Sequence, residues 1–249
     1  MDSDNNEKKF KSMSRRELLK LSPLLLMSVF AFETTSDPIL LKGQQLNDWL
    51  SSQFFRRNQL APTFANSKLT QLRRFPINSI NADDPGIDLE RWRLKVEGNV
   101  EKPGEFTMEQ IKKLPKVTQN TRHVCVEGWD VIGRFGGARL SDFLKMIGAD
   151  TNSRYLYFDC YDEYYESLDM DTALHPQSLL CYEMYDQPIP RVHGAPLRLI
   201  LPTKIGYKSA KYLTTIKVTN ILERTSLFED KGKGLGYWGN KGYSWYYGL

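Results

Sequence analysis

Apolar and polar residues alternate along several short stretches of the chain, and this pattern predicts β-strands. In "DLERWRLKVEG" the side chains of Trp92, Leu94 and Val96 occupy alternate positions, as on a strand with one buried face. Further on, segments rich in β-forming residues predict more strands, divided by turn residues such as Asp186 and Pro188. These segments are RYLYFDC, EYYESLDM, SLLCYEMY, PLRLILP and KYLTTIKVT.

Two segments carry a helical pattern instead. In "TMEQIKKLP", Thr107 precedes Gln110 by three residues, as in a capping box, and Pro115 ends the helix. In "LSDFLKMIG" the apolar residues recur at helical spacing, and Gly148 follows where a C-terminal glycine is common. Short helices among many short strands predict an α+β domain with mixed sheets.

The N-terminal segment has the layout of an export signal. Arg15 and Arg16 precede an apolar run, Leu21 to Phe32, that is too short to cross a bilayer as a helix of about 20 residues. The run "SRRELLK" resembles the twin-arginine export signal, and a short amphipathic helix is the alternative. We predict a signal segment at residues 1–36 and a domain at residues 37–249. Cleavage near Ser36 and retention as a membrane tether both stay open, because no A-x-A triplet follows.

Composition and charge narrow the function classes. The chain has 249 residues, of which 41% are hydrophobic and 26% charged, as in globular proteins, and its net charge is +4. The basic residues are scattered rather than clustered, which argues against a nucleic-acid partner. The sequence contains no C-x-x-C, H-E-x-x-H, P-loop or G-x-S-x-G motif.

The three cysteines leave at least one thiol outside any intramolecular disulfide. Cys160 and Cys181 lie in strand-like runs, where a cysteine commonly serves as a small buried hydrophobe. Cys125 instead precedes "EGWD" and a glycine-rich stretch, which we expect to be a loop that approaches a ligand closely. A thiolate is a soft ligand that suits a transition metal. A core thiol and a reactive thiol for disulfide exchange are the alternatives for Cys125.

A basic segment follows further along, in "HGAPLRLILPTKIGYKSAKYL". It contains one histidine and four cations, which are His193, Arg198, Lys204, Lys208 and Lys211. Arginine offers a planar fork to phosphate, and lysine offers a point charge. The segment is therefore either an anion cradle or an ordinary pair of solvated strands.

Three blocks of the sequence resemble a known family. They are "TRHVCVEGWDVIGRFGGARLSDFL", "YYESLDMDTALHPQSLLCYEMYDQPIPRVHGAPLRLILPTKIGYKSAKYL" and "GYWGNKGYSWYYGL". From about Arg74 onward the chain is similar to the molybdopterin-binding domain of the sulfite oxidase family. The likeness is greatest to its bacterial branch exported by the twin-arginine route, which includes the catalytic subunit of the periplasmic methionine sulfoxide reductase. The resemblance implies that fold, with mixed β-sheets and short helices.

The resemblance also implies a cofactor and its contacts, namely one molybdenum-molybdopterin per chain. The metal-binding cysteine of the family falls on Cys125. The positions where the family contacts the pterin are Asn78, Cys160, His193, Arg198, Ser209, Ala210 and Lys211. The chain departs from the family at Phe135, where tryptophan is usual, and in lacking an Asn-Phe-Tyr-Glu run.

The function implied is two-electron oxygen-atom transfer on a small-molecule substrate by an exported, periplasmic oxidoreductase. Reduction of a sulfoxide or another S- or N-oxide is the first hypothesis. Oxidation of sulfite or a similar oxyanion is the second, and it would want cations at the metal, with Arg122 as the catalytic candidate. Arg122 equally suits a structural salt bridge. A non-catalytic binding module on the same fold is the third. The resemblance implies electrons from an external partner, a membrane haem subunit or a soluble cytochrome.

Overall fold

The structure is a computed structural model that describes residues 59–78, 84–125 and 127–221. The predicted signal segment, the boundary near residue 36 and the block "GYWGNKGYSWYYGL" lie outside these residues. Within the described part, no helix is long and apolar enough to cross a membrane.

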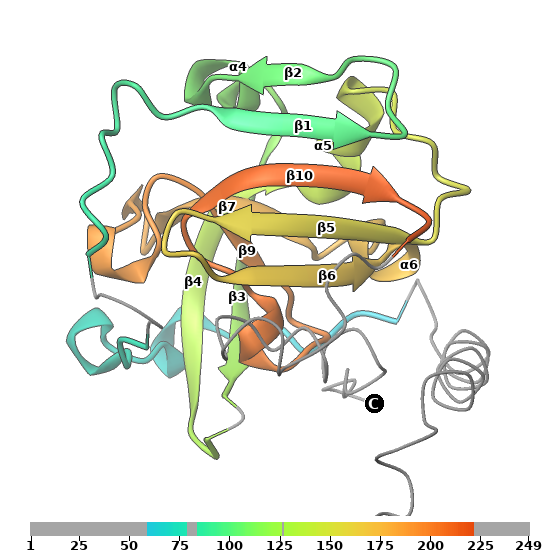
Figure 1. The fold of residues 1–249 in the computed structure, drawn as a ribbon. Coiled ribbons are helices and arrows are strands. Elements are labelled where there is room, and N and C mark those ends of the chain that lie inside the picture. The colour runs from blue at the N-terminus through green and yellow to red at the C-terminus, as the bar shows by residue number, and fades with distance from the viewer. Residues whose placement is uncertain (1–58, 79–83, 126, 222–249) are drawn as a thin grey trace, which may run out of the picture. The chain divides into compact units, whose positions relative to one another are not determined.

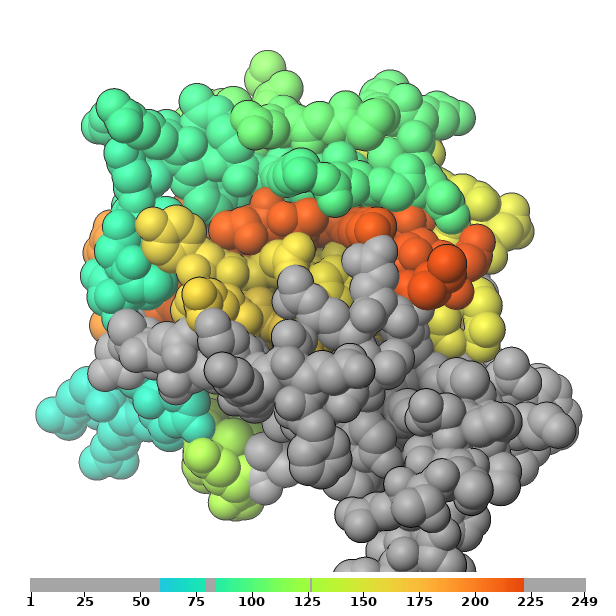
Figure 2. Space-filling model, viewed as in Figure 1, coloured from blue at the N-terminus to red at the C-terminus, as the bar shows by residue number. Residues whose placement is uncertain are grey.

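Five strands form the first sheet, in the order β2-β1-β10-β5-β6, and only β1 and β10 run parallel. Their bounds are β1 Leu94–Gly98, β2 Gly104–Phe106, β5 Tyr155–Cys160, β6 Tyr165–Asp169 and β10 Leu213–Thr219. This sheet lies nearest the viewer in Figure 1. In the space-filling view of the same face, the side chains of β10 lie directly against those of the β5–β6 hairpin (Figure 2).

The second sheet contains another five strands, all antiparallel to their neighbours. β7 pairs with β4 along one edge and with β8 and β9 along the other, and β3 lies outside β4. The bounds are β3 Lys116–Val124, β4 Asp130–Arg139, β7 Leu179–Met184, β8 Gln187–Pro188 and β9 Arg198–Ile200. The β3–β4 hairpin extends beyond the edge of the first sheet (Figure 1).

The helices of the described residues are short. The α-helices are α4 Met108–Lys112, α5 Leu140–Met146 and α6 Met170–Ala173. The 3-10 turns are η1 Asn66–Lys68, η2 Leu72–Arg74, η3 Arg191–His193 and η4 Gly206–Lys208. The capping box predicted for α4 is confirmed, because Gln110 N donates to the Thr107 side chain and the Gln110 side chain accepts from Thr107 N. Gly148, predicted to follow α5, has a left-handed φ of 63°.

Two hydrophobic clusters hold the sheets. The larger joins the first sheet to α4, α5 and one face of β7, and it contains the predicted alternating residues Trp92, Leu94 and Val96. The smaller covers the opposite face of β7, with Leu179 and Cys181 packed near Phe75. Because β7 is buried on both faces, its sequence is almost continuously apolar rather than alternating.

The glycine-rich stretch after Cys125 is not the ligand-bending loop that we expected. Gly133, Gly136 and Gly137 lie inside β4, and only Gly128 lies in the turn before it. The reason is close packing between strands. A Cβ built on Gly137 would lie 2.1 Å from the carbonyl oxygen of Leu180 on β7, next to an irregularity in the pairing.

Replacing Gly137 with alanine should therefore destabilise the second sheet. The added methyl group meets backbone, which has to shift, and we expect a loss of about 1–3 kcal/mol in the free energy of unfolding. Urea denaturation measures this loss. Gly136→Ala is the matched control, because its Cβ would meet side chains rather than backbone, with Glu183 at 3.1 Å and Thr118 at 3.6 Å. Equal stability of the two variants would contradict the packing argument.

Candidate functional site

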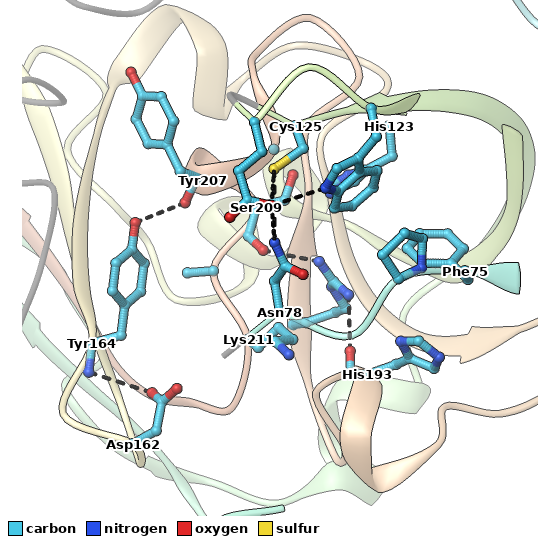
Figure 3. A pocket seen from close by; sticks show the side chains of 16 residues that line it. Phe75, Asn78, His123, Cys125, Asp162, Tyr164, His193, Tyr207, Ser209 and Lys211 are labelled. Carbon is cyan, nitrogen blue, oxygen red and sulfur yellow. Dashed lines mark hydrogen bonds between the residues drawn. The ribbon is translucent and has the colours of Figure 1, made fainter. Parts of the chain in front are cut away.

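A cavity of about 280 Å³ lies where segments from both sheets meet. Its walls come from the chain before β1, the β3–β4 turn, the β5–β6 turn, η3, the start of β9, and η4 with the residues that follow it. Figure 3 shows their side chains converging on one space, with Cys125 and Asp162 at opposite ends. These wall segments are far apart in the sequence, so the site exists only in the folded chain.

Cys125 occupies the tight turn between β3 and β4. Its N–H donates to the Trp129 carbonyl at 2.9 Å, and its carbonyl accepts from Gly128 N at 3.1 Å. Gly128 supports this turn with a φ of 92°, which few other residues adopt. The Cys125 sulfur lies 3.9 Å from Asn78 Nδ2 (Figure 3). None of the three cysteines, all within the described residues, forms a disulfide.

The Glu127 carboxylate organises the polar groups beside this thiol. Its Oε2 accepts from Asn78 Nδ2 at 2.8 Å and from Trp129 Nε1 at 3.0 Å, and it lies 3.8 Å from the Cys125 sulfur. The bonds from Trp129 and then Asn78 lower the pKa of Glu127 below its usual range. Glu127 therefore fixes the Asn78 amide against Cys125.

The Arg198 guanidinium is buried at another wall of the cavity, with 4% of the residue exposed. It donates to the carbonyls of His193 at 2.9 Å, Ser209 at 3.1 Å and Leu199 at 3.3 Å. Burial lowers the pKa of Arg198 to about 10, so it stays charged at neutral pH. Among the described residues no carboxylate forms a salt bridge with it. A buried cation whose contacts are neutral carbonyls suits an anionic ligand.

Lys211 supplies a second cation, and its Nζ donates to the Val192 carbonyl at 3.1 Å. Arg198 and Lys211 act on the two histidines of the cavity. Burial and then these two charges lower the pKa of His123 to about 3, and the residue as a whole is half-buried. The same causes lower the pKa of His193 to about 4. Both rings are neutral near pH 7, so the positive charge at the cavity comes from Arg198 and Lys211.

The lowered pKa of His193 predicts a pH-dependent stability. The unfolded chain binds a proton near pH 6.5, whereas the folded chain binds it near pH 4. The contribution is present above pH 6.5 and is lost as the pH falls towards 4. Between pH 7 and 5 it amounts to about 2 kcal/mol at most. The variant His193→Asn should lose correspondingly less stability than the parent over this range in urea denaturation of the cofactor-free chain. An equally steep loss in parent and variant would refute this.

Seven of the residues predicted from the sequence line this one cavity. They are Asn78, Cys125, His193, Arg198, Ser209, Ala210 and Lys211. Two others do not line it. Arg122 forms a salt bridge with Asp130 at 3.3 Å, and its guanidinium lies 5.4 Å from the centre of the Phe64 ring. Cys160 is buried in the larger core cluster, where desolvation raises the pKa of its thiol well above the usual value.

The structure adds wall residues that the sequence did not single out. Asp162 and Tyr164 come from the β5–β6 turn, and the only signal for them is the pair of turn-forming residues Asp162 and Glu163 between two strands. Phe75 packs against both histidine rings, with centroid distances of 5.8 Å to His123 and 5.3 Å to His193. These contacts join segments that are far apart in the sequence, so no local sequence pattern predicts them.

Gly206 shows how tightly the wall segments pack. A Cβ at this position would lie 2.7 Å from His123 Nε2 and 2.9 Å from the Val124 carbonyl. The absent side chain lets η4 approach the end of β3, next to Cys125. A larger residue at this position would push η4 away from the end of β3 and so change the shape of the cavity.

Comparison with known proteins assigns the family. The family described as oxidoreductase molybdopterin binding domain matches residues 81–226. The chain belongs to this family. It is an enzyme, an oxidoreductase that binds molybdopterin, as the resemblance in its sequence predicted. The residues at the cavity fit this group: a soft sulfur donor and a buried guanidinium face one space, and the guanidinium suits the phosphate of the pterin.

Curated relatives support the assignment. The chain is 39% identical over 211 residues to a putative protein-methionine-sulfoxide reductase subunit YedZ1 of Azospira oryzae, covering 84% of this chain and 76% of that protein. It is 29% identical over 170 residues to the protein-methionine-sulfoxide reductase catalytic subunit MsrP of Xanthomonas campestris, covering 62% and 53%. For MsrP of Burkholderia mallei the values are 31% over 151 residues, covering 54% and 46%. The chain thus spans about half the length of these MsrP relatives.

A solved structure supports the fold. The sulfane dehydrogenase SoxCD from Paracoccus pantotrophus matches with a TM-score of 0.53 and 18% identity, covering 70% of this chain and 52% of that chain. The predicted α+β fold with mixed sheets and short helices, of the sulfite oxidase type, is confirmed.

Proposed function

We propose that this chain carries one molybdenum-molybdopterin and reduces a sulfoxide or another S- or N-oxide. The observation that carries the proposal is the convergence of the Cys125 thiol and the buried Arg198 cation on one cavity in a molybdopterin-family oxidoreductase. The overall reaction takes R₂S=O, two electrons and two protons to R₂S and water. The relatives described above are named as a putative methionine sulfoxide reductase subunit and as MsrP catalytic subunits, and these names support the same substrate class.

The residues that line the cavity have separate roles in this proposal. Cys125, as a thiolate, supplies the protein's sulfur ligand to molybdenum, a pairing of soft donor and soft metal. Arg198 and Lys211 anchor the phosphate of the pterin, assisted by the segment Ser209-Ala210. Glu127 holds the side-chain amide of Asn78 beside the Cys125 sulfur. The bound cofactor supplies the two-electron chemistry, and the chain binds and orients it.

A neutral oxide fits the cavity better than an oxyanion such as sulfite. Among the described residues that line the cavity, Arg198 is the single arginine, and this proposal already assigns it to the phosphate of the pterin. Arg122 pairs with Asp130, and Arg134 binds Asp186 at 2.8 Å. Neither lines the cavity wall, so neither supports an oxyanion at the metal.

The remaining parts of the proposal are export and electron supply. The run from Ser14 to Lys20 supports export to the periplasm by the twin-arginine route, with the N-terminal segment either cleaved or kept as a tether. The electrons come from an external partner, a membrane haem subunit or a soluble cytochrome. Fractionation of cells expressing the full chain, with Arg15 and Arg16 replaced by lysine as the control, tests the export step.

An anaerobic substrate screen tests the reaction. Purified holoenzyme reduced by a dye is offered methionine sulfoxide and an N-oxide, and oxidised holoenzyme is offered sulfite. We expect an oxide to reoxidise the dye and sulfite to give no turnover. Turnover with sulfite alone would overturn the direction of the reaction. Full cofactor loading with no turnover on any of these substrates would favour the non-catalytic module. Rapid alkylation of Cys125 in the loaded protein would favour the disulfide-exchange thiol.

A further inference from the structure

Lys208 lies in the segment that forms one wall of the cavity, but its side chain does not face the cavity. It ends η4, and its neighbours Tyr207 and Ser209 both line the cavity. The ammonium of Lys208 turns the other way, towards β6, and only 2% of the residue is exposed. It donates to Glu166 Oε2 at 2.7 Å and to the Ser167 carbonyl at 2.7 Å.

Glu166 completes this buried ion pair on β6, where 1% of the residue is exposed. Besides Lys208, its Oε2 accepts from Ser167 N at 2.8 Å. The hydroxyl of Tyr164, another wall residue, lies 3.2 Å from Glu166 Oε1 and 2.9 Å from the Tyr207 carbonyl. The second of these contacts is drawn in Figure 3. The network therefore connects β6 and the residue before it to two adjacent residues of η4, to Tyr207 through its carbonyl and to Lys208 through its ammonium.

The opposite side of the segment is attached to β9. Arg198 donates to the Ser209 carbonyl at 3.1 Å, Leu199 N donates to the Ala210 carbonyl at 2.8 Å, and the Ser209 hydroxyl accepts from Leu201 N at 3.1 Å. The stretch that contributes Ser209, Ala210 and Lys211 to the cavity is thus fixed from both sheets.

A fully buried ion pair is a weak source of stability, because the desolvation of both charges offsets their attraction. Apolar residues of similar size often replace such a pair without loss of stability. Its best-attested use is to specify one geometry. The Lys208–Glu166 pair lies directly behind the cavity wall. Fixing the geometry of that wall therefore explains the pair better than a contribution to stability does.

We propose that the Lys208–Glu166 pair, with Tyr164, positions residues 206–211 for binding of the pterin phosphate. These are positioning residues that act through the wall segment. The inference rests on the proposed cofactor contacts of that segment. Without the pair, the wall backbone and the Lys211 ammonium would sample several arrangements, and the bound pterin would leave faster.

The test compares the parent with the variant Lys208→Met/Glu166→Met in the full-length chain. Both charges are removed together, so no lone buried charge remains. The chain just before residues 206–211 stays attached in this variant, since Lys204 Nζ lies 3.4 Å from Asp169 Oδ2. Lys116→Met is the matched control, because it breaks the exposed Lys116–Glu183 pair of 2.9 Å on the second sheet.

Two measurements separate positioning from folding. The first is amide hydrogen exchange of residues 206–211 in cofactor-free protein, and the second is the release rate of pterin from loaded protein, followed by pterin fluorescence. We expect the double variant to keep a thermal midpoint close to that of the parent while both rates rise about tenfold, the size of effect seen for residues that orient ligands. The control should change neither rate. Parent-like exchange and release in a folded double variant would overturn the proposal.

Hydrogen exchange needs no cofactor, so its outcome does not depend on molybdenum binding or turnover. If the double variant does not fold, Tyr164→Phe decides the question, since it removes only the hydroxyl between Glu166 and the Tyr207 carbonyl. Faster exchange at residues 207–209 in Tyr164→Phe would support positioning. Parent-like exchange there would overturn it.

Discussion

The variant Cys125→Ser should lose at least about 100-fold of its sulfoxide reductase activity while keeping its fold and most of its pterin. Replacing a group that only orients a metal ligand costs roughly 10- to 100-fold, and loss of the ligand itself should cost at least as much. A serine hydroxyl is a hard, weakly acidic donor, so it replaces the soft thiolate poorly. Arg198 and Lys211 are untouched, so the phosphate anchor stays. Dye-linked turnover and pterin content measure the two effects on one sample.

Cys181→Ala is the control for the loss of a thiol. Cys181 is fully buried in β7, and burial raises the pKa of its thiol to about 12, so it serves as a core residue. We expect a stability loss of about 1 kcal/mol with turnover and pterin content near those of the parent. A Cys125→Ser enzyme as active as the parent would refute the ligand assignment.

The variant Arg198→Met should lose the cofactor rather than the metal alone. The substitution removes a charge-assisted contact worth about 1.5–3 kcal/mol to an anion, which corresponds to about 10- to 100-fold in affinity. It also leaves the buried carbonyls of His193 and Ser209 without their donor, at about 1–3 kcal/mol each. Pterin content after extensive dialysis and the thermal midpoint should therefore both fall.

Arg198→Lys and Arg134→Met complete this comparison. Lysine keeps the charge but not the planar fork, so Arg198→Lys should retain an intermediate pterin content. Arg134 pairs with Asp186 outside the cavity, and its replacement should leave pterin content unchanged. Full retention of pterin by Arg198→Met would show that the guanidinium is not the anchor.

Local physical patterns allowed much of the fold to be predicted. The alternation of Trp92, Leu94 and Val96 identified β1, and the capping box at Thr107 identified α4. The long β3–β4 hairpin was missed, because the burial of β3 does not alternate cleanly and β4 is rich in glycine. Gly136 and Gly137 lie close to β7, and Gly133 leaves room for the Phe135 and Phe75 side chains. The contacts with β7 and Phe75 join distant segments, which local sequence does not encode.

The residues of the cavity also divide into those that the sequence predicted and those that it did not. Motif resemblance predicted Cys125, Arg198 and Lys211, which lie together. The resemblance also predicted a cofactor contact for Cys160, and this contact stays a prediction, since Cys160 lies in the larger core cluster and is not among the residues that line the cavity. Asp162 and Tyr164 reach the cavity through the β5–β6 turn, and their position depends on the pairing of two strands rather than on a motif.

The bond between the Cys125 sulfur and molybdenum is tested most directly by X-ray absorption at the molybdenum edge. Loaded parent and loaded Cys125→Ser are compared at equal metal content. The predicted result is one sulfur neighbour fewer in the variant, with the sulfur atoms of the pterin retained in both. Identical sulfur coordination in the two proteins would contradict the assignment of Cys125 as the metal ligand.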